Sequence, residues 1–170
     1  MIDQRTLDKF EKLYKESYDE VSRYVVCNCN YIEDVKDIIQ NTYMAVFKKI
    51  DRIENKEYIL GIAKNKTKDY YRFKYRSKIV DINDDVIKEV VPDDFDLEQS
   101  VFLKYDAEKV WEYLTKKPVT VAKVFYLYFY SQMTIRDISR ELDMTESNVK
   151  NYIYRNLKEL NKYLQREGKE

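Results

Sequence analysis

The chain has 170 residues, of which 44% are hydrophobic and 36% are charged, values that suit one or two small domains and not a large enzyme fold. With only two glycines and two prolines, it lacks material for hairpin turns or a glycine-rich phosphate loop, so we expect an all-α fold. The absence of histidine excludes serine–histidine and cysteine–histidine catalysis. These classes of enzyme are therefore excluded, and we expect no cofactor.

The net charge is zero, but its distribution along the chain is uneven. Residues 1–76 hold 16 basic and 13 acidic residues, and residues 101–170 hold 13 and 10. Residues 77–100 hold 2 and 8, together with Pro92, a composition typical of a solvated connection. We therefore predict two small helical domains, 1–76 and 101–170, joined by a flexible acidic linker.

Cys27 and Cys29 are the only cysteines, and on a helix two such positions point in different directions. They are therefore expected to be free thiols and not a zinc site or a local disulfide. No apolar run approaches the roughly 20 residues that span a bilayer, and the first residues do not form a signal peptide. We expect a cytoplasmic protein without membrane insertion.

In the first domain, apolar residues recur every three or four positions, the spacing of a buried helix face. The pattern predicts one helix around Leu7–Val25 and a second around Val35–Ile50. A third helix is expected from the N-cap Asn55 toward Arg76. Gly61 in its interior costs about 1 kcal/mol relative to alanine, which indicates close packing there.

In the second domain, helical spacing runs from Leu97 through Leu114, and Pro118 opens a very apolar helix. Thr134 is expected to cap a short helix, and Thr145 a longer one after a break at Asp143 and Met144. Two helices joined by so short a break predict a helix-turn-helix. Six polar residues are expected off the apolar stripe of the last helix, where they would meet DNA: Ser147, Asn148, Lys150, Asn151, Tyr154 and Arg155. An ordinary helical hairpin with solvated polar residues is the alternative.

Residues 56–78 hold eight basic and two acidic residues. Five aromatic residues are interleaved with them: Tyr58, Tyr70, Tyr71, Phe73 and Tyr75. Cations neutralise phosphates and rings stack on unpaired bases, so the run is a candidate platform for single-stranded or melting DNA. The same run also fits a helix with an aromatic core face and a solvated lysine face, and both interpretations stay open.

An acidic cluster of Glu33, Asp34 and Asp37 lies at the start of the second helix. Nothing nearby supplies further oxygen ligands for a metal ion or a pocket for acid–base chemistry. A surface for a positively charged partner, or a favourable charge near a helix N-terminus, is the preferred interpretation.

In this order of parts, the chain resembles the extracytoplasmic-function sigma factors, the small two-domain specificity subunits of bacterial RNA polymerase. Residues 37–43 are similar to the family's helix that binds the β′ clamp helices of core polymerase. Residues 58–72 are similar to the segment that recognises and opens the minus-ten element, and residues 147–155 to the recognition helix for the minus-thirty-five element. The sequence departs from the family pattern at four positions. Tyr58 stands where the family usually has tryptophan, and Asp143 where the turn usually has glycine. Tyr152 and Asn156 stand where arginine and alanine are common.

The resemblance implies three sets of contact residues. Core polymerase would be bound by Asp37, Ile38, Gln40, Asn41 and Tyr43. The minus-ten region would be bound by Tyr58, Lys64, Asn65, Lys68, Asp69 and Arg72. The helix-turn-helix would contact DNA through Thr145, Ser147, Asn148, Lys150, Asn151, Tyr154 and Arg155.

The resemblance also implies partners and a function. An alternative sigma factor binds the β′ clamp helices and the β flap of core polymerase and places it on promoter DNA. Family members are commonly held inactive by an anti-sigma factor, often a membrane-anchored one. The rival hypothesis is a stand-alone helix-turn-helix transcriptional regulator whose N-terminal domain dimerises or senses a ligand.

Overall fold

The computed structural model describes residues 3–77 and 107–167, which fall into two compact units, Met1–Ile82 and Asn83–Glu170. All regular structure within these described ranges is helical, which confirms the predicted all-α fold. The predicted linker lies outside the described residues, apart from its first residue. Each unit is treated by itself below.

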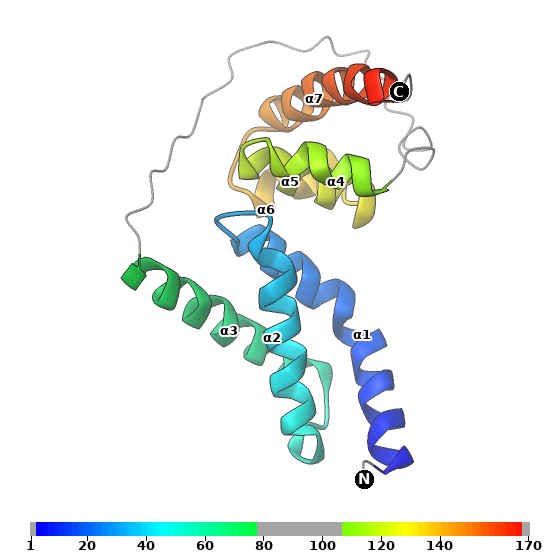
Figure 1. Cartoon of the computed structure of the whole chain (residues 1–170), viewed down its shortest axis with the longest axis vertical. Coiled ribbons are helices and arrows are strands. Elements are labelled where there is room, and N and C mark those ends of the chain that lie inside the picture. The colour runs from blue at the N-terminus through cyan, green and yellow to red at the C-terminus, as the bar shows by residue number, and fades with distance from the viewer. Residues whose placement is uncertain (1–2, 78–106, 168–170) are drawn as a thin grey trace. The chain divides into compact units, whose positions relative to one another are not determined.

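The first unit contains α1 (Gln4–Asn28), α2 (Asp34–Lys48), the 3-10 turn η1 (Ile50–Arg52) and α3 (Lys56–Ser77). Figure 1 shows α3 crossing α2, and α3 contacts both α1 and α2. The Asn55 side chain accepts a hydrogen bond of 3.1 Å from the Tyr58 amide, as expected of an N-cap. The three predicted helices and this cap are confirmed.

The core of the first unit is built from the apolar stripes of its three helices. Val21 and Val25 of α1, Ile38 and Val46 of α2, and Ile59 of α3 are all fully buried. Complete burial of such a side chain contributes about 1.5 to 3 kcal/mol. The apolar residues spaced three and four apart on these helices thus form one shared interior. Their packing determines which faces of α2 and α3 remain exposed.

Gly61 lies in the exposed part of α3 and not in the core. A Cβ atom added to it would meet nothing within 4 Å. The expectation that this glycine permits close packing between helices is therefore wrong within the described unit.

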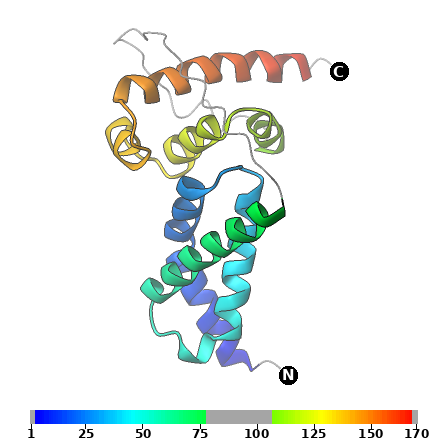
Figure 2. The same cartoon turned by 90° about the vertical axis from the view of Figure 1, so that its left-hand side faces the viewer.

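The second unit contains α4 (Ala107–Thr115), α5 (Val119–Phe125), the π-helical turn η3 (Tyr126–Tyr130), α6 (Ile135–Glu141) and α7 (Glu146–Glu167). The long α7 contacts α4, α5 and α6, and Figure 2 shows it spanning this unit as one continuous helix. Pro118 is the N-cap of α5, one position before the first helical turn. Phe125, Leu127, Ile138, Ile153 and Leu160 are almost completely buried among these helices.

The turn between α6 and α7 has the geometry of a helix-turn-helix. Thr134 Oγ1 accepts a 3.1 Å hydrogen bond from the Asp137 amide, and Thr145 Oγ1 accepts one of 3.1 Å from the Asn148 amide. Asp143 has a φ of 52°, in the left-handed region that aspartate enters more readily than most residues. Both threonine caps and the tolerance of aspartate at the turn are confirmed.

Neither Cys27 nor Cys29 forms a disulfide within the described ranges. Cys27 is half-buried, and Cys29 is buried with its Sγ donating a 3.1 Å hydrogen bond to the Val26 carbonyl. The helices in residues 3–77 and 107–167 are all too short or too polar to cross a membrane.

Candidate nucleic-acid interface

One face of α2 is exposed along most of the helix. It comprises residues spaced by three or four positions: Asp37, Gln40, Asn41, Met44 and Lys48. Met44 in its centre is 51% exposed, although methionine is a residue that usually packs in a core. This polar stripe with an apolar centre is open to a protein partner.

Two of the residues predicted to bind polymerase do not belong to this face. Ile38 is completely buried and Tyr43 is 6% exposed, so their assignment as direct contacts is wrong. The Tyr43 hydroxyl lies 2.9 Å from the Ser17 hydroxyl, and burial raises the pKa of Tyr43 to about 12. Both side chains face inward because they continue the apolar stripe of α2 that packs on α1.

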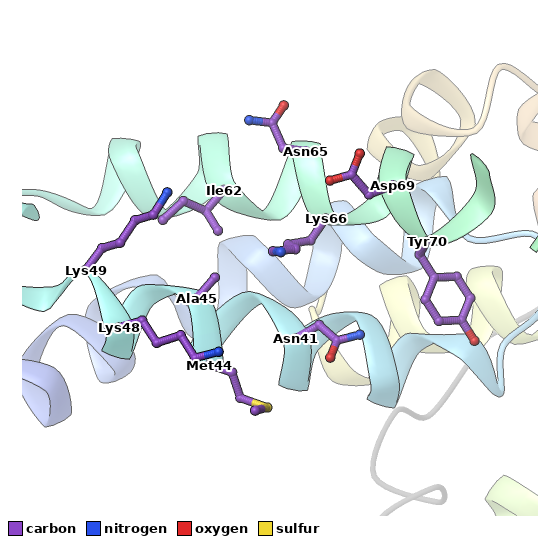
Figure 3. Close-up of a pocket in the computed structure, with 10 residues that line it drawn as sticks. All are labelled: Asn41, Met44, Ala45, Lys48, Lys49, Ile62, Asn65, Lys66, Asp69 and Tyr70. Carbon is purple, nitrogen blue, oxygen red and sulfur yellow. The ribbon is translucent and has the colours of Figure 1, made fainter. Parts of the chain in front are cut away.

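A polar groove of about 670 Å³ lies between α2 and α3. It is lined by Asn41, Met44, Ala45, Lys48, Lys49, Ile62, Asn65, Lys66, Asp69 and Tyr70. Figure 3 shows Lys49 and Lys66 extending into the space between the helices, whereas Asn65 projects away from α2. Three lysines against one carboxylate make this groove suited to an anionic ligand.

The residues predicted to contact the minus-ten element are all exposed on α3: Tyr58, Lys64, Asn65, Lys68, Asp69 and Arg72. Asn65 and Asp69 line the polar groove together with Asn41, a residue predicted to bind polymerase. The other four lie outside the groove. The Asp69 carboxylate is 3.7 Å from the Arg72 guanidinium, so these two charges partly neutralise each other at the surface.

Other members of the aromatic and basic run turn inward and bind Asp34. The Asp34 carboxylate accepts 3.0 Å hydrogen bonds from the Tyr70 and Tyr71 hydroxyls. The Lys74 ammonium lies 2.8 Å from both carboxylate oxygens and 4.4 Å from the centroid of the Tyr31 ring. We call Asp34, Tyr70, Tyr71 and Lys74 the Asp34 clasp. It ties the C-terminal half of α3 to the start of α2.

The tyrosines of the Asp34 clasp remain hydrogen-bond donors at all physiological pH values. Burial, reinforced by the Asp34 carboxylate, raises the pKa of Tyr70 to about 12 and that of Tyr71 further. The Tyr71 hydroxyl also accepts a 2.8 Å hydrogen bond from the Asn30 amide, just before α2. The core interpretation of the run therefore holds for Tyr71 and for the half-buried Tyr70, whereas Tyr58, Phe73 and Tyr75 are exposed together with most of the basic residues.

The Asp34 clasp was missed in the sequence, although a pattern for the burial of Tyr71, one of its members, is present. Ile59, Ala63, Thr67 and Tyr71 recur every four residues, and all four are buried. Extending the apolar stripe of α3 through the threonine places Tyr71 inside. The acidic cluster likewise divides, because Asp34 is buried whereas Glu33 and Asp37 are exposed.

On the recognition helix α7, Ser147 is exposed, and Asn148, Lys150, Tyr154 and Arg155 are half-buried. Thr145 is exposed with its hydroxyl engaged as the cap. Asn151 is only 3% exposed, so its placement off the apolar stripe is wrong, and we no longer expect it to reach a base edge. Its side-chain oxygen is buried without a hydrogen-bond partner among the described residues.

A polar network fixes α7 against α4 on the side away from the turn. The Tyr113 hydroxyl is 3.2 Å from a Glu159 carboxylate oxygen and 3.3 Å from the Asn156 carbonyl. Lys117 also pairs with Glu159 and lowers the pKa of that carboxyl below its usual range. Because α7 is held at this end, the position of its first turns is set by the fold of the whole unit.

Comparisons with known proteins found one matching protein family and a similar solved structure. Residues 108–160 match the family model described as "Sigma-70, region 4". Among solved structures, the sigma factor RpoE from Bartonella quintana, in complex with the anti-sigma factor NepR, covers 92% of this chain and 96% of its own. That match has a TM-score of 0.48 and 16% sequence identity. No curated protein sequence matches the chain.

The family match spans α4 to α6 and most of α7, the segment in which the capped helices, the left-handed turn and the polar first turns of α7 were found. Independent observations of sequence and geometry thus agree on this part of the chain. The sigma-factor resemblance is confirmed there, and residues 108–160 of this protein form a sigma-70 region 4 domain.

Proposed function

We propose that the protein is an alternative sigma factor of the extracytoplasmic-function class, which binds core RNA polymerase and directs it to specific promoters. The observation that carries the proposal is the region 4 domain. The exposed basic face of α3 in the first unit gives further support. In this proposal, α2 binds the β′ clamp helices and α3 recognises and opens the minus-ten element. The region 4 domain binds the minus-thirty-five element and the β flap.

Two further parts of the proposal concern regulation and location. The protein acts in the cytoplasm without catalytic activity of its own, and an anti-sigma factor, anchored in the membrane or soluble, holds it inactive. Support comes from the resemblance of the chain to a family with such partners.

Run-off transcription tests the proposed function directly. Core polymerase with this protein should initiate at discrete sites on fragments of the parent genome, whereas core polymerase alone should not. A stand-alone regulator would instead bind duplex DNA without polymerase and would not promote initiation by core enzyme. That outcome would replace the sigma-factor proposal.

Polymerase binding is expected to depend on the exposed face of α2. Asp37→Arg reverses a charge at the start of that face and should weaken association with core polymerase by about tenfold or more, since like charges across an interface are costly. Fluorescence anisotropy of the labelled protein titrated with core enzyme measures the affinity. Asp19→Arg, an equal charge reversal at an exposed position of α1, is the control. Equal affinities for the two variants would remove Asp37 from the interface.

On α7, Lys150 is expected to contact phosphate and Asn148 a base edge. Lys150→Ala should weaken holoenzyme binding on all promoters and reduce the slope of log affinity against log salt by about 0.9, because about one counterion fewer is released. Asn148→Ala should leave the slope unchanged and relax discrimination at one or two upstream positions, at a cost of roughly 1 to 3 kcal/mol on the matched sequence. Binding is measured at several salt concentrations on single-base promoter variants. Identical slopes for Lys150→Ala and the wild type would argue against the phosphate contact.

A further inference from the structure

The polar groove between α2 and α3 gathers three lysines without a counter-charge. Lys48 and Lys49 line it at the C-terminal end of α2, and Lys66 lines it from α3. Within the described residues none of these ammonium groups forms an ion pair, although Lys66 is half-buried. Four other lysines of the same unit each pair with a carboxylate: Lys12, Lys15, Lys56 and Lys74. A partly desolvated cation beside two like charges is costly unless an anion joins them.

The carboxylate in the groove does not fill that role. Asp69 is the acidic residue among those that line it, and its carboxylate lies 3.7 Å from the Arg72 guanidinium. The three ammonium groups therefore leave an excess of positive charge that suits a ligand with several negative charges. Lysine is a common phosphate binder in proteins, which makes a chain of phosphates the fitting anion.

The other end of the groove offers a different chemistry. Figure 3 shows Lys49 at one end and Asn41 and Tyr70 at the other, with Lys66 between them. The Tyr70 hydroxyl donates a 3.0 Å hydrogen bond to Asp34, which holds the half-buried ring in place. A tyrosine ring stacks on a planar base, and an exposed asparagine amide pairs with a base edge.

The size of the groove matches a small molecule that combines these two parts. Its volume of about 670 Å³ lies within the range of small-molecule sites. We propose that the groove binds a nucleoside polyphosphate, with the phosphates at the three lysines and the base at Asn41 and Tyr70.

A nucleotide in this groove covers part of the face of α2 that is proposed to bind polymerase. Asn41, Met44 and Lys48 belong both to that exposed face and to the lining of the groove. The nucleotide therefore competes with core polymerase for the free protein. This consequence rests on the proposed function, whereas nucleotide binding itself is measured without polymerase.

The test of binding uses the full chain and ATP labelled with a fluorescent methylanthraniloyl group. Lys49→Ala and Lys66→Met should each weaken binding at least about tenfold, because a charge-assisted contact with phosphate is lost. Lys66→Met keeps the apolar stem of the half-buried side chain and with it the fold. Lys36→Met removes an exposed lysine of α2 outside the groove lining and should bind like the wild type. Tripolyphosphate, which lacks a base, should displace the probe at least about tenfold less well than unlabelled ATP.

Three results would overturn the inference while leaving the proposed function intact. They are no binding of the probe to the wild type at about 1 mM, equal affinities for the Lys66→Met and Lys36→Met variants, and equal displacement by tripolyphosphate and ATP. The last result would mean that the groove accepts any polyanion.

Competition is tested by titrating the labelled protein with core polymerase. ATP at about ten times its dissociation constant should weaken core binding about tenfold, as mass action requires of a competitor. The double variant Lys49→Ala, Lys66→Met should bind core polymerase equally well with and without ATP. An equal response of the two proteins would refute competition at this groove, and a failure of run-off transcription alone would refute the proposed function.

Discussion

Asp34→Ala is expected to lower the free energy of unfolding of the first unit by about 3 kcal/mol. Removing one partner of a buried ion pair typically costs about 3 to 5 kcal/mol. The lower end applies here because the Lys74 side chain is 32% exposed. The Tyr70 and Tyr71 hydroxyls lose their acceptor in the same variant. Urea denaturation followed by circular dichroism measures the loss.

Asp37→Ala is the matched control, because it removes the same carboxylate from an exposed position one turn further along α2. Its effect on stability should stay within about 0.5 kcal/mol, as for most surface substitutions. Similar losses for the two alanine variants would show that Asp34 acts through the charge of the helix start and not through the Asp34 clasp.

Phe125→Ala should destabilise the second unit by about 3 to 5 kcal/mol, since a large, 1% exposed side chain is replaced by a cavity. Trp111 in α4 is the only tryptophan in the chain, so its fluorescence reports the unfolding of this unit alone. The tryptophan transition should move to a lower urea concentration. Promoter binding through the region 4 domain should fall with it.

Two other variants test whether the effect of Phe125→Ala depends on its buried position and whether it is confined to the second unit. Tyr130→Ala removes an aromatic ring that is 56% exposed in the adjoining π-helical turn, and its effect should be well under that of Phe125→Ala. Asp34→Ala should leave the tryptophan transition in place, because its contacts lie in the first unit. A shift of that transition in Asp34→Ala would contradict the division into two separately stable units.

Most of the fold was predictable because the helical spacing of apolar residues is strong in this chain. Ile38 and Val46 in α2, or Ile153 and Leu160 in α7, mark a buried face without any tertiary knowledge. Local capping was equally readable, since the Asn55, Thr134 and Thr145 side chains each bond an amide three residues later. Both properties depend on residues close together in the sequence.

The site was less predictable because it depends on how helices pack and on which polar residues that packing buries. Spacing alone put Asn151 on the surface of α7, yet contacts from other helices bury it. Motif similarity alone predicted that Ile38 and Tyr43 contact core polymerase, although both side chains are buried in the core of the first unit. Pairing of Asp34 with Lys74, 40 residues later, depends on the crossing of α2 and α3, which no local pattern encodes.

The turn between α6 and α7 limits which changes of length the region 4 domain tolerates. Asp143 leaves α6 in the left-handed region, and the Asp143 and Met144 amides donate hydrogen bonds back to the Arg140 and Ser139 carbonyls. One residue inserted between Leu142 and Thr145 would break this closed turn and displace the start of α7. Val149 and Ile153, both fully buried, would then lose their place in the interior. Helix α6 has only seven residues and cannot absorb such a change by itself. Homologous domains are therefore expected to vary in the residues of this turn far more freely than in their number.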